Sequence, residues 1–310
     1  MIYTVDIDNR MTLVKEIQQL KKARNAIILA HNYQLGEVQD IADFVGDSLE
    51  LSQSAAKTHA YVIVFCGVHF MAETASILCP DKTVLLPDVS AGCPMANMIT
   101  AERLREKKQE NPKATVVCYI NSSAEVKAES DICCTSANAV KVIESLDAQE
   151  ILFVPDQYLG HYVAGKTNKK IILWPGFCPT HVRIQPEDIA RLRQEYPQAK
   201  VVVHPECRPE VIALADEVLS TGGMCKYARK GEVNEMIVGT EIGIIHRLRK
   251  ENPGKRFIPV SEQAICPNMK SITLEEVLWS LEGMTPEVKV LEEIRLRAKK
   301  AVDKMLEIGG

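Results

Sequence analysis

Three stretches of this chain repeat one pattern of polar and apolar positions. They begin at Met11, Ile99 and Ile184, run 38 residues each without a gap, and are offset by 88 and then 85 residues. Each opens with a charged amphipathic run, as in a surface helix, and continues into a short apolar run, as in a buried parallel strand. Self-similarity at a fixed period is the mark of a repeated structural unit. The pattern therefore predicts three related units.

Helix starts recur at the head of each copy. Thr12, Thr100 and Gln185 precede the amphipathic runs. Thr100 is a good N-cap residue, and Pro186 suits a first helical turn. Further along, three glutamates are expected to begin helices and three aspartates to have structural roles. These residues are Glu37, Glu125 and Glu210, and Asp43, Asp131 and Asp216.

Apolar runs predict the strands. They cover residues 26–30, 61–65 and 83–86 in the first copy, 115–118, 151–154 and 171–173 in the second, and 201–203, 236–238 and 256–258 in the third. Short buried strands that alternate with helices favour an α/β fold of three similar three-layer α/β/α domains with parallel sheets. We expect domains at residues 1–96 plus 267–310, 97–182 and 183–266. The helical tail over 287–306 is expected to pack on the first of them.

Composition and charge narrow the class of protein. At 310 residues the chain exceeds what one core usually supports. Its 25% charged and 46% hydrophobic residues are typical of a globular protein in water. A net charge of -4 without a Lys/Arg run argues against nucleic acid, and no apolar stretch reaches the length of a membrane span.

The start of the chain and its cysteines indicate a compartment. Residues 1–10 carry acidic side chains and no apolar core, so we expect no signal peptide. Ten cysteines in such a chain point to free thiols or metal ligation rather than to disulfides. The expected localisation is cytoplasmic.

Polar residues follow the first predicted strand of each copy. The carboxyl ends of strands in open α/β sheets are where ligands bind. Three domains around an approximate threefold axis would direct these ends at one cavity. The alternative, that they are only satisfied polar residues at strand ends, is weaker for six in register than for one. The six are His31, Tyr33, Tyr119, Asn121, His204 and Glu206, of which Glu206 and the histidines are general acid/base candidates.

A hydroxyl closes the repeated stretch in every copy. Ser48, Ser136 and Thr221 each precede a helix-like segment. A hydroxyl beside the free N–H groups of a helix N-terminus can bind phosphate or carboxylate. The alternative is that these residues are N-caps and nothing more.

Three Cys-Pro dipeptides, at Cys93, Cys178 and Cys266, follow the last strand of each unit, whereas a fourth, at Cys79, is out of register. Thiolates select zinc, copper(I) or iron–sulfur clusters. The short Cys-x-x-Cys spacings of structural zinc are absent, and a cubane cluster normally takes four cysteines. Three ligands would leave one iron open as a Lewis acid for substrate.

The other cysteines fit a simpler role as small buried hydrophobic residues. They include Cys66, Cys118, Cys133, Cys134, Cys207 and Cys225. The chain has no P-loop and no Gly-x-Gly-x-x-Gly, so a bound nucleotide is not expected.

Five motifs resemble the quinolinate synthase family, and the resemblance covers nearly the whole chain. They are Ala-His-Asn-Tyr at 30–33, Cys-Gly-Val-His-Phe-Met-Ala-Glu at 66–73, Ala-Gly-Cys-Pro-Met at 91–95, His-Pro-Glu-Cys at 204–207 and Cys-Pro-Asn-Met at 266–269. The resemblance implies three similar domains around a pseudo-threefold axis that carries a [4Fe–4S] cluster. It implies condensation of iminosuccinate with dihydroxyacetone phosphate to quinolinate, the pyridine precursor of NAD, with loss of phosphate and water. An aspartate-oxidising enzyme is expected to supply the iminosuccinate.

The resemblance also assigns residues. Cys93, Cys178 and Cys266 would ligate the cluster, and Tyr33 and Glu206 would take part in proton transfers. His31 and His204, general acid/base candidates by their position, are the other expected catalytic residues. Substrate binding would fall to His31, Ser48, Tyr119, Ile120, Asn121, Ser136, His204, Pro205, Glu206 and Thr221. The segment from Ser220 to Met224 departs from the Thr-Ser-Gly-Met common in the family, which affects only the contact at Gly222.

Three alternatives stay open at this point. One is a different iron–sulfur hydro-lyase that uses the same open iron. A second is a non-catalytic iron–sulfur sensor, which would not need polar residues lining a cavity. The third is zinc in place of the cluster.

Overall fold

The structure is a computed structural model that describes residues 2–309, and the side chains of residues 10–309. The chain divides into two compact units. The first holds the residues up to 92 together with 267–290, and the second holds 93–266 and the residues from 291 on. The proposed boundaries of the three repeats stay a prediction, because this division does not test them.

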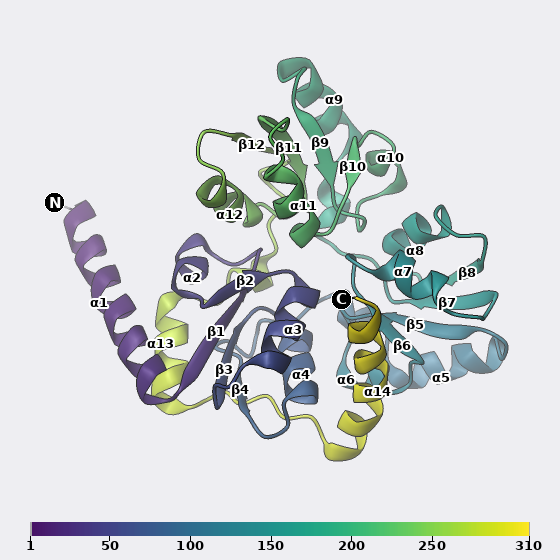
Figure 1. Ribbon diagram of the computed structural model, residues 1–310, viewed down its shortest axis with the longest axis horizontal. Helices are drawn as coiled ribbons and strands as arrows, with labels where there is room; N and C mark the ends of the chain where they lie inside the picture. Colours follow the sequence, from purple (N-terminus) through teal and green to yellow (C-terminus); the bar gives the residue numbers. More distant parts are fainter. Residues whose placement is uncertain (1, 310) are drawn as a thin grey trace. The chain divides into compact units, whose positions relative to one another are not determined.

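The first unit contains one parallel sheet, in the order β2-β1-β3-β4 (Figure 1). Its strands are β1 (Ala26–His31), β2 (Phe44–Gly46), β3 (Val62–Cys66) and β4 (Thr83–Leu85). The helices are α1 (Ile2–Ala23), α2 (Gly36–Ile41), α3 (Ser48–Lys57), α4 (His69–Leu78) and α13 (Leu274–Gly283), with the 3₁₀ turn η3 (Pro267–Met269). α13 packs against α1 and β3, so the returning chain completes this unit.

The second unit contains two sheets of the same topology, ordered β6-β5-β7-β8 and β10-β9-β11-β12. The strands of the first are β5 (Thr115–Tyr119), β6 (Ile132–Cys134), β7 (Glu150–Val154) and β8 (Lys170–Leu173). Those of the other are β9 (Lys200–Val203), β10 (Glu217–Val218), β11 (Glu235–Gly239) and β12 (Arg256–Pro259). Every pairing within the described sheets is parallel. The α/β fold with three similar sheets is therefore confirmed.

Helices flank both sheets of the second unit. The helices of the middle repeat are α5 (Ala101–Glu110), α6 (Ala124–Ala128), α7 (Ala139–Glu144), α8 (Gln157–Ala164), α14 (Glu292–Ile308) and the 3₁₀ turn η1 (Ala96–Met98). With the third go α9 (Pro186–Glu195), α10 (Pro209–Ile212), α11 (Thr221–Ala228), α12 (Ile244–Glu251) and η2 (His181–Arg183).

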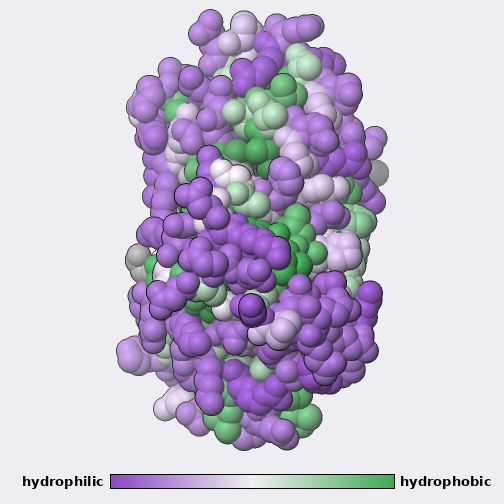
Figure 2. Space-filling model, turned by 90° about the vertical axis from the view of Figure 1, so that its right-hand side faces the viewer, coloured by the Kyte–Doolittle hydropathy of each residue, from purple (hydrophilic) through white to green (hydrophobic). Residues whose placement is uncertain are grey.

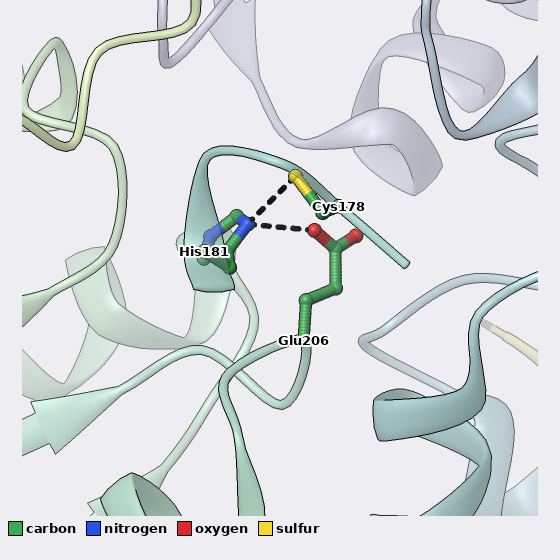
Figure 3. A group of neighbouring side chains, drawn as sticks. All are labelled: Cys178, His181 and Glu206. Atoms are coloured by element: carbon green, nitrogen blue, oxygen red, sulfur yellow. Dashed lines mark hydrogen bonds and ion pairs between the residues drawn. The ribbon is translucent and has the colours of Figure 1, made fainter. Parts of the chain in front are cut away.

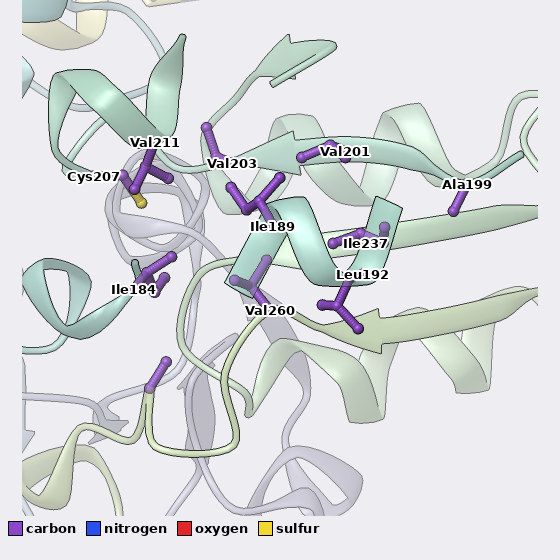
Figure 4. Packing of buried hydrophobic residues seen from close by; sticks show 11 residues of the cluster. Ile184, Ile189, Leu192, Ala199, Val201, Val203, Cys207, Val211, Ile237 and Val260 are labelled. Carbon is purple, nitrogen blue, oxygen red and sulfur yellow. The ribbon is translucent and has the colours of Figure 1, made fainter. Parts of the chain in front are cut away.

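Alternation along β9 produces the layers of the third repeat. Val201 and Val203 point to one face and pack with α9 and α10, through residues such as Ile189 (Figure 4). Val202 points to the opposite face and packs with α11 and α12, through residues such as Met224. Because successive side chains of a strand point to opposite faces, a strand that is apolar throughout needs helices on both.

Each sheet has one strand that the apolar runs did not predict. The missed strands are β2, β6 and β10, which are two or three residues long and pair only with the first strand of their repeat. Such segments are too short to show a period. Each of these short strands is nevertheless held in place by the repeated aspartate that directly precedes it.

The repeated aspartates bind the first strand of their own sheet through the backbone. Asp43 Oδ2 accepts from Ile28 N–H at 2.8 Å, Asp131 Oδ2 from Val116 N–H at 2.8 Å, and Asp216 Oδ2 from Val201 N–H at 2.7 Å. The N–H of each aspartate donates back to the carbonyl of the same residue. The structural role expected for these aspartates is confirmed.

A lysine before the fourth strand recurs in the same way. Lys169 Nζ donates to Ile143 O at 2.7 Å and to Leu146 O, just beyond α7. Lys255 Nζ donates to Ala228 O and Lys230 O at 2.7 and 2.6 Å, at the end of α11. Lys82 does the same beyond α3. An ammonium group at helix C-terminal carbonyls satisfies free acceptors and complements the helix dipole.

Two expectations about helices are wrong. α1 begins at Ile2, well before Thr12. α14 packs on α6 and β6, whereas the tail was expected on the first repeat. Arg297 donates to Glu129 Oε1 at 2.6 Å and Asn138 Nδ2 to Met305 O at 3.3 Å, so side-chain contacts decide its place. By contrast, Thr100 caps α5 as expected, accepting from Arg103 N–H at 3.3 Å.

The surface is mainly polar in the face that Figure 2 shows, with small separate apolar areas. Among the described residues, no helix combines the length and apolar character needed to cross a membrane.

We expect Asp131→Ala to destabilise the protein, because it leaves the Val116 N–H without its carboxylate partner. A lost hydrogen bond to a charged group lowers the free energy of unfolding by about 1–3 kcal/mol. Asp147→Ala, at an exposed turn residue, is the matched control. Denaturant unfolding of both variants checks this, and equal stabilities would contradict a structural role for Asp131.

Candidate functional site

The polar residues predicted at strand ends do lie there. His31 is the last residue of β1, Tyr119 is the last residue of β5, and His204 directly follows β9. His31, Tyr33 and Ser48 belong to the first unit, and the other predicted site residues belong to the second.

In the first unit, His31 and Tyr33 form a buried pair. Tyr33 N–H donates to His31 Nδ1 at 3.2 Å, and the two rings meet edge to face with centroids 4.6 Å apart. Lys270 Nζ donates to the backbone carbonyl of Tyr33. The backbone of this turn is therefore fixed from both sides, which orients the two side chains.

The equivalent turn of the third repeat places Glu206 at the centre of a buried polar network. Glu206 N–H donates to His204 Nδ1 at 3.3 Å, as Tyr33 does to His31. The Tyr119 hydroxyl donates to Glu206 Oε1, and His181 Nδ1 lies 2.8 Å from Oε2. The rings of His181 and His204 stack with centroids 4.7 Å apart. Residues of two repeats thus meet on one carboxylate.

The electrostatics of this network favour an ionised Glu206. Burial alone would raise the pKa of its carboxyl group, but the charges of His181 and His204 oppose this. Together with hydrogen bonds from His181 and Tyr119 they hold the pKa well below its usual range. A buried carboxylate that is paired and hydrogen-bonded keeps its charge.

The ten cysteines differ in exposure. All are free, and seven are buried, whereas Cys93, Cys178 and Cys266 are partly exposed. These three are the cysteines that the repeat register selected. All three lie in the second unit.

The three partly exposed thiols also interact with one another. Burial, together with the charges on Glu206 and Cys266, raises the pKa of Cys93 to about 12. Burial, Glu206 and Cys93 likewise raise the pKa of Cys178. In the absence of a cation Cys93 and Cys178 hold their protons, so a metal that binds them must displace protons.

Cys178 has two further donors beside it (Figure 3). His181 Nδ1 lies 3.2 Å from Cys178 Sγ, and one ligand atom each from Cys178, His181 and Glu206 lie within 4.8 Å of one another. This group is compatible with a metal. His181 is itself oriented from behind, because its Nε2 lies 2.8 Å from Thr240 Oγ1.

The hydroxyls at the ends of the repeated stretches are not N-caps in the first and third copies. Asp47 caps α3 and Ser220 caps α11, so Ser48 and Thr221 occupy the first helical position instead. Ser136 Oγ lies 3.2 Å from His204 Nε2. The N-cap alternative is therefore wrong for Ser48 and Thr221.

The neighbouring backbone segments are buried as well. Ile120 N–H donates to Cys134 O at 2.8 Å, and Pro205 is buried beside His204. Asn121 Oδ1 is buried without a hydrogen-bond partner among the described residues. A buried amide oxygen without a partner costs free energy unless a ligand supplies a donor.

Sequence reasoning missed His181 and Thr240. The residue three places after the cysteine is Ala96 in the first copy, His181 in the second and Met269 in the third. A lone histidine where its counterparts are apolar was a usable signal. Thr240 follows β11 with no such contrast, because Gly67 and Pro155 stand in its place.

Glu206→Gln should lower the stability of the metal-free protein by about 1–3 kcal/mol at pH 6. The lowered pKa means that the carboxylate contributes stability fully above the unfolded value, about 4.3, and loses it as pH falls towards the folded value. The difference from the unmodified protein should therefore shrink between pH 6 and about 3.5. Denaturant unfolding over this range checks it, with exposed Glu210→Gln as control. A constant difference would contradict the assignment.

Comparison with known proteins identifies the family. The family model for quinolinate synthetase A protein matches residues 15–307. A quinolinate synthase of Dehalococcoides mccartyi strain CBDB1 is 66% identical over 299 residues, covering 96% of this chain and 99% of the relative. Those of Geotalea uraniireducens and Methanosarcina barkeri are 60% and 56% identical, over 94% and 96% of this chain and 96% and 97% of their own lengths. The chain therefore belongs to the quinolinate synthase family of enzymes.

Proposed function

We propose that this enzyme condenses iminosuccinate with dihydroxyacetone phosphate to quinolinate, releasing phosphate and water, with a [4Fe–4S] cluster held by Cys93, Cys178 and Cys266. The observation that carries the proposal is the contrast in exposure. Of ten free cysteines, the three in register are the ones that are not buried. Their thiols interact electrostatically within one unit, as ligands of one cluster would.

The donor set fits an iron–sulfur cluster. Thiolates are its usual ligands, and three of them leave one iron without a protein sulfur. When bound, such a cluster supplies a Lewis acid that can hold a departing or coordinating oxygen. Cys79, whose thiol is buried and donates to Ala55 O at 3.1 Å, belongs to the core instead.

Residues of the second unit suit a small anionic substrate. Asn121 Oδ1 can accept from an imine or hydroxyl group, since it is buried without a partner among the described residues. The Ser136 hydroxyl beside His204 can donate to a carboxylate. Thr221 opens α11, where backbone N–H groups and the helix dipole favour an anion.

A chain of hydrogen bonds can carry the proton transfers. It runs from the Tyr119 hydroxyl through Glu206 to His181. An ionised carboxylate beside an imidazole can take a proton from carbon or nitrogen and pass it on. We assign the remaining proton transfers to Tyr33 with His31. Tyr33 N–H donates to His31 Nδ1 in the same way as Glu206 N–H donates to His204 Nδ1. Ser48, Ile120 and Pro205 complete the proposed contacts.

The arrangement of the three repeats around a pseudo-threefold axis, with boundaries at 96, 182 and 266, is part of this proposal. So are the supply of iminosuccinate by an aspartate-oxidising enzyme and a cytoplasmic location.

The deciding experiment is product formation. Protein purified and reconstituted without oxygen should convert iminosuccinate, generated in place, and dihydroxyacetone phosphate to quinolinate. Chromatography with mass detection measures the product. A cluster-replete preparation that forms no quinolinate would contradict the proposed reaction.

Cys178→Ser should lose the cluster, whereas Cys79→Ser should keep it. The unmodified protein and Cys79→Ser should be brown and hold about four irons per chain, as a cubane requires. Iron analysis and visible absorption measure this under strictly anaerobic conditions. A colourless, zinc-containing protein would favour zinc on the mixed Cys178, His181 and Glu206 donors. Equal losses in the two variants would refute the choice of ligands.

A further inference from the structure

Two adjacent buried residues after β11 contact the cysteine loops of two repeats. Thr240 Oγ1 lies 2.8 Å from His181 Nε2, and His181 Nδ1 lies 3.2 Å from Cys178 Sγ. Glu241 Oε1 accepts from the backbone N–H of Cys266 at 3.2 Å. The dipeptide therefore connects the surroundings of two proposed ligands, and neither residue is among the site residues predicted from the sequence.

Glu241 is placed to fix the Cys266 loop. It is fully buried, and its Oε2 accepts from Gly243 N–H at 2.7 Å while Oε1 holds Cys266. The next residue, Ile242, donates its N–H to Ala264 O at 3.0 Å. The loop is thus held both two residues before the thiol and at the cysteine itself. A side chain that uses both oxygens in this way has few alternative positions.

Comparison of the three repeats shows which contacts of the cysteine loops recur. The N–H of His69 donates to Ala91 O, that of Gln157 to Gly176 O and that of Ile242 to Ala264 O, so this backbone contact is common to all. The counterparts of Glu241 are Val68 in the first repeat and Asp156 in the second.

The counterparts of Glu241 make different contacts. Val68 has no side-chain acceptor. Asp156 Oδ1 accepts from Tyr158 and Leu159 N–H at 2.8 and 2.9 Å and so caps α8. Asp156 also interacts with the backbone N–H of Cys178. A carboxylate therefore faces the cysteine backbone in two of the three repeats, and in the third repeat Glu241 Oε1 accepts from Cys266 N–H at 3.2 Å.

We propose that Glu241 is a positioning residue that holds the Cys266 loop in the conformation that ligates the cluster, with Thr240 holding His181 against Cys178. This rests on the proposed function for the identity of the bound group. The carboxylate acts from behind the ligand, as groups that orient metal ligands through hydrogen bonds do. Hydrogen bonding and buried polar groups around a cluster also set its reduction potential.

The substitution Glu241→Gln tests this with little change in size. An amide has one acceptor oxygen, so either Cys266 N–H or Gly243 N–H faces an NH₂ group instead. We expect the Cys266 amide of the metal-free protein to exchange its hydrogen about tenfold faster. We also expect less iron per chain after reconstitution and a shifted reduction potential in the fraction that loads.

Glu262→Gln is the matched control, because Glu262 is exposed and lies in the same loop. It should leave exchange, iron content and potential unchanged. Thr240→Val, which removes only the hydroxyl, should change the potential while leaving exchange at Cys266 unchanged.

Three outcomes are separable. If Glu241→Gln matches the unmodified protein in Cys266 exchange and iron content, the positioning role is refuted. If it differs only as much as Glu262→Gln does, the effect is one of charge, which also refutes positioning. If Glu241→Gln raises the exchange rate at Cys266 but the unmodified protein takes up no iron, the role of Glu241 in fixing the loop is supported and the proposed cluster is refuted.

Discussion

Parallel pairing is the constraint on which the rest of this structure depends. In each sheet the first strand of the repeat lies between the short second strand, at the edge, and the third strand, and all four run parallel. Their carboxyl ends therefore lie on one edge, and whatever residue follows a strand is delivered to that edge. Tyr119 ends β5, whereas His204 and Thr240 directly follow β9 and β11, so three different strands place these residues. The common direction of the strands thus determines where the candidate site residues lie.

The repeat made much of this accessible from sequence. The three sheets, their long strands, the cap at Thr100 and the polar residues at the ends of the first strands followed from periodicity and register. The choice among ten cysteines also followed, since register separated three that turn out to be partly exposed. Each of these features repeats, so three copies supplied the signal that a single copy would lack.

The features that the sequence did not predict are those that show no repeated pattern. β2, β6 and β10 are too short to have a period, and they exist because an aspartate and the neighbouring strand hold them. α14 is amphipathic, and nothing in its sequence says which repeat will receive it. His181 stands where its counterparts are apolar, so comparison of the copies marks the position but does not show its contact with Glu206. The copies likewise do not show that Glu241 accepts from the N–H of Cys266. Tertiary contacts between repeats are not contained in the pattern of any one of them.

The lysines that donate to carbonyls at the ends of α3, α7 and α11 show which contacts the three repeats share. These lysines and the repeated aspartates that bind the first strand are the same in all three copies, whereas the residues at the strand ends are tyrosine, histidine, asparagine or glutamate. The contacts that hold the backbone frame are thus common to the repeats, and the residues that differ lie at the strand ends. A change of side chain at a strand end leaves these backbone contacts intact, so the three strand ends can differ while the three sheets stay alike.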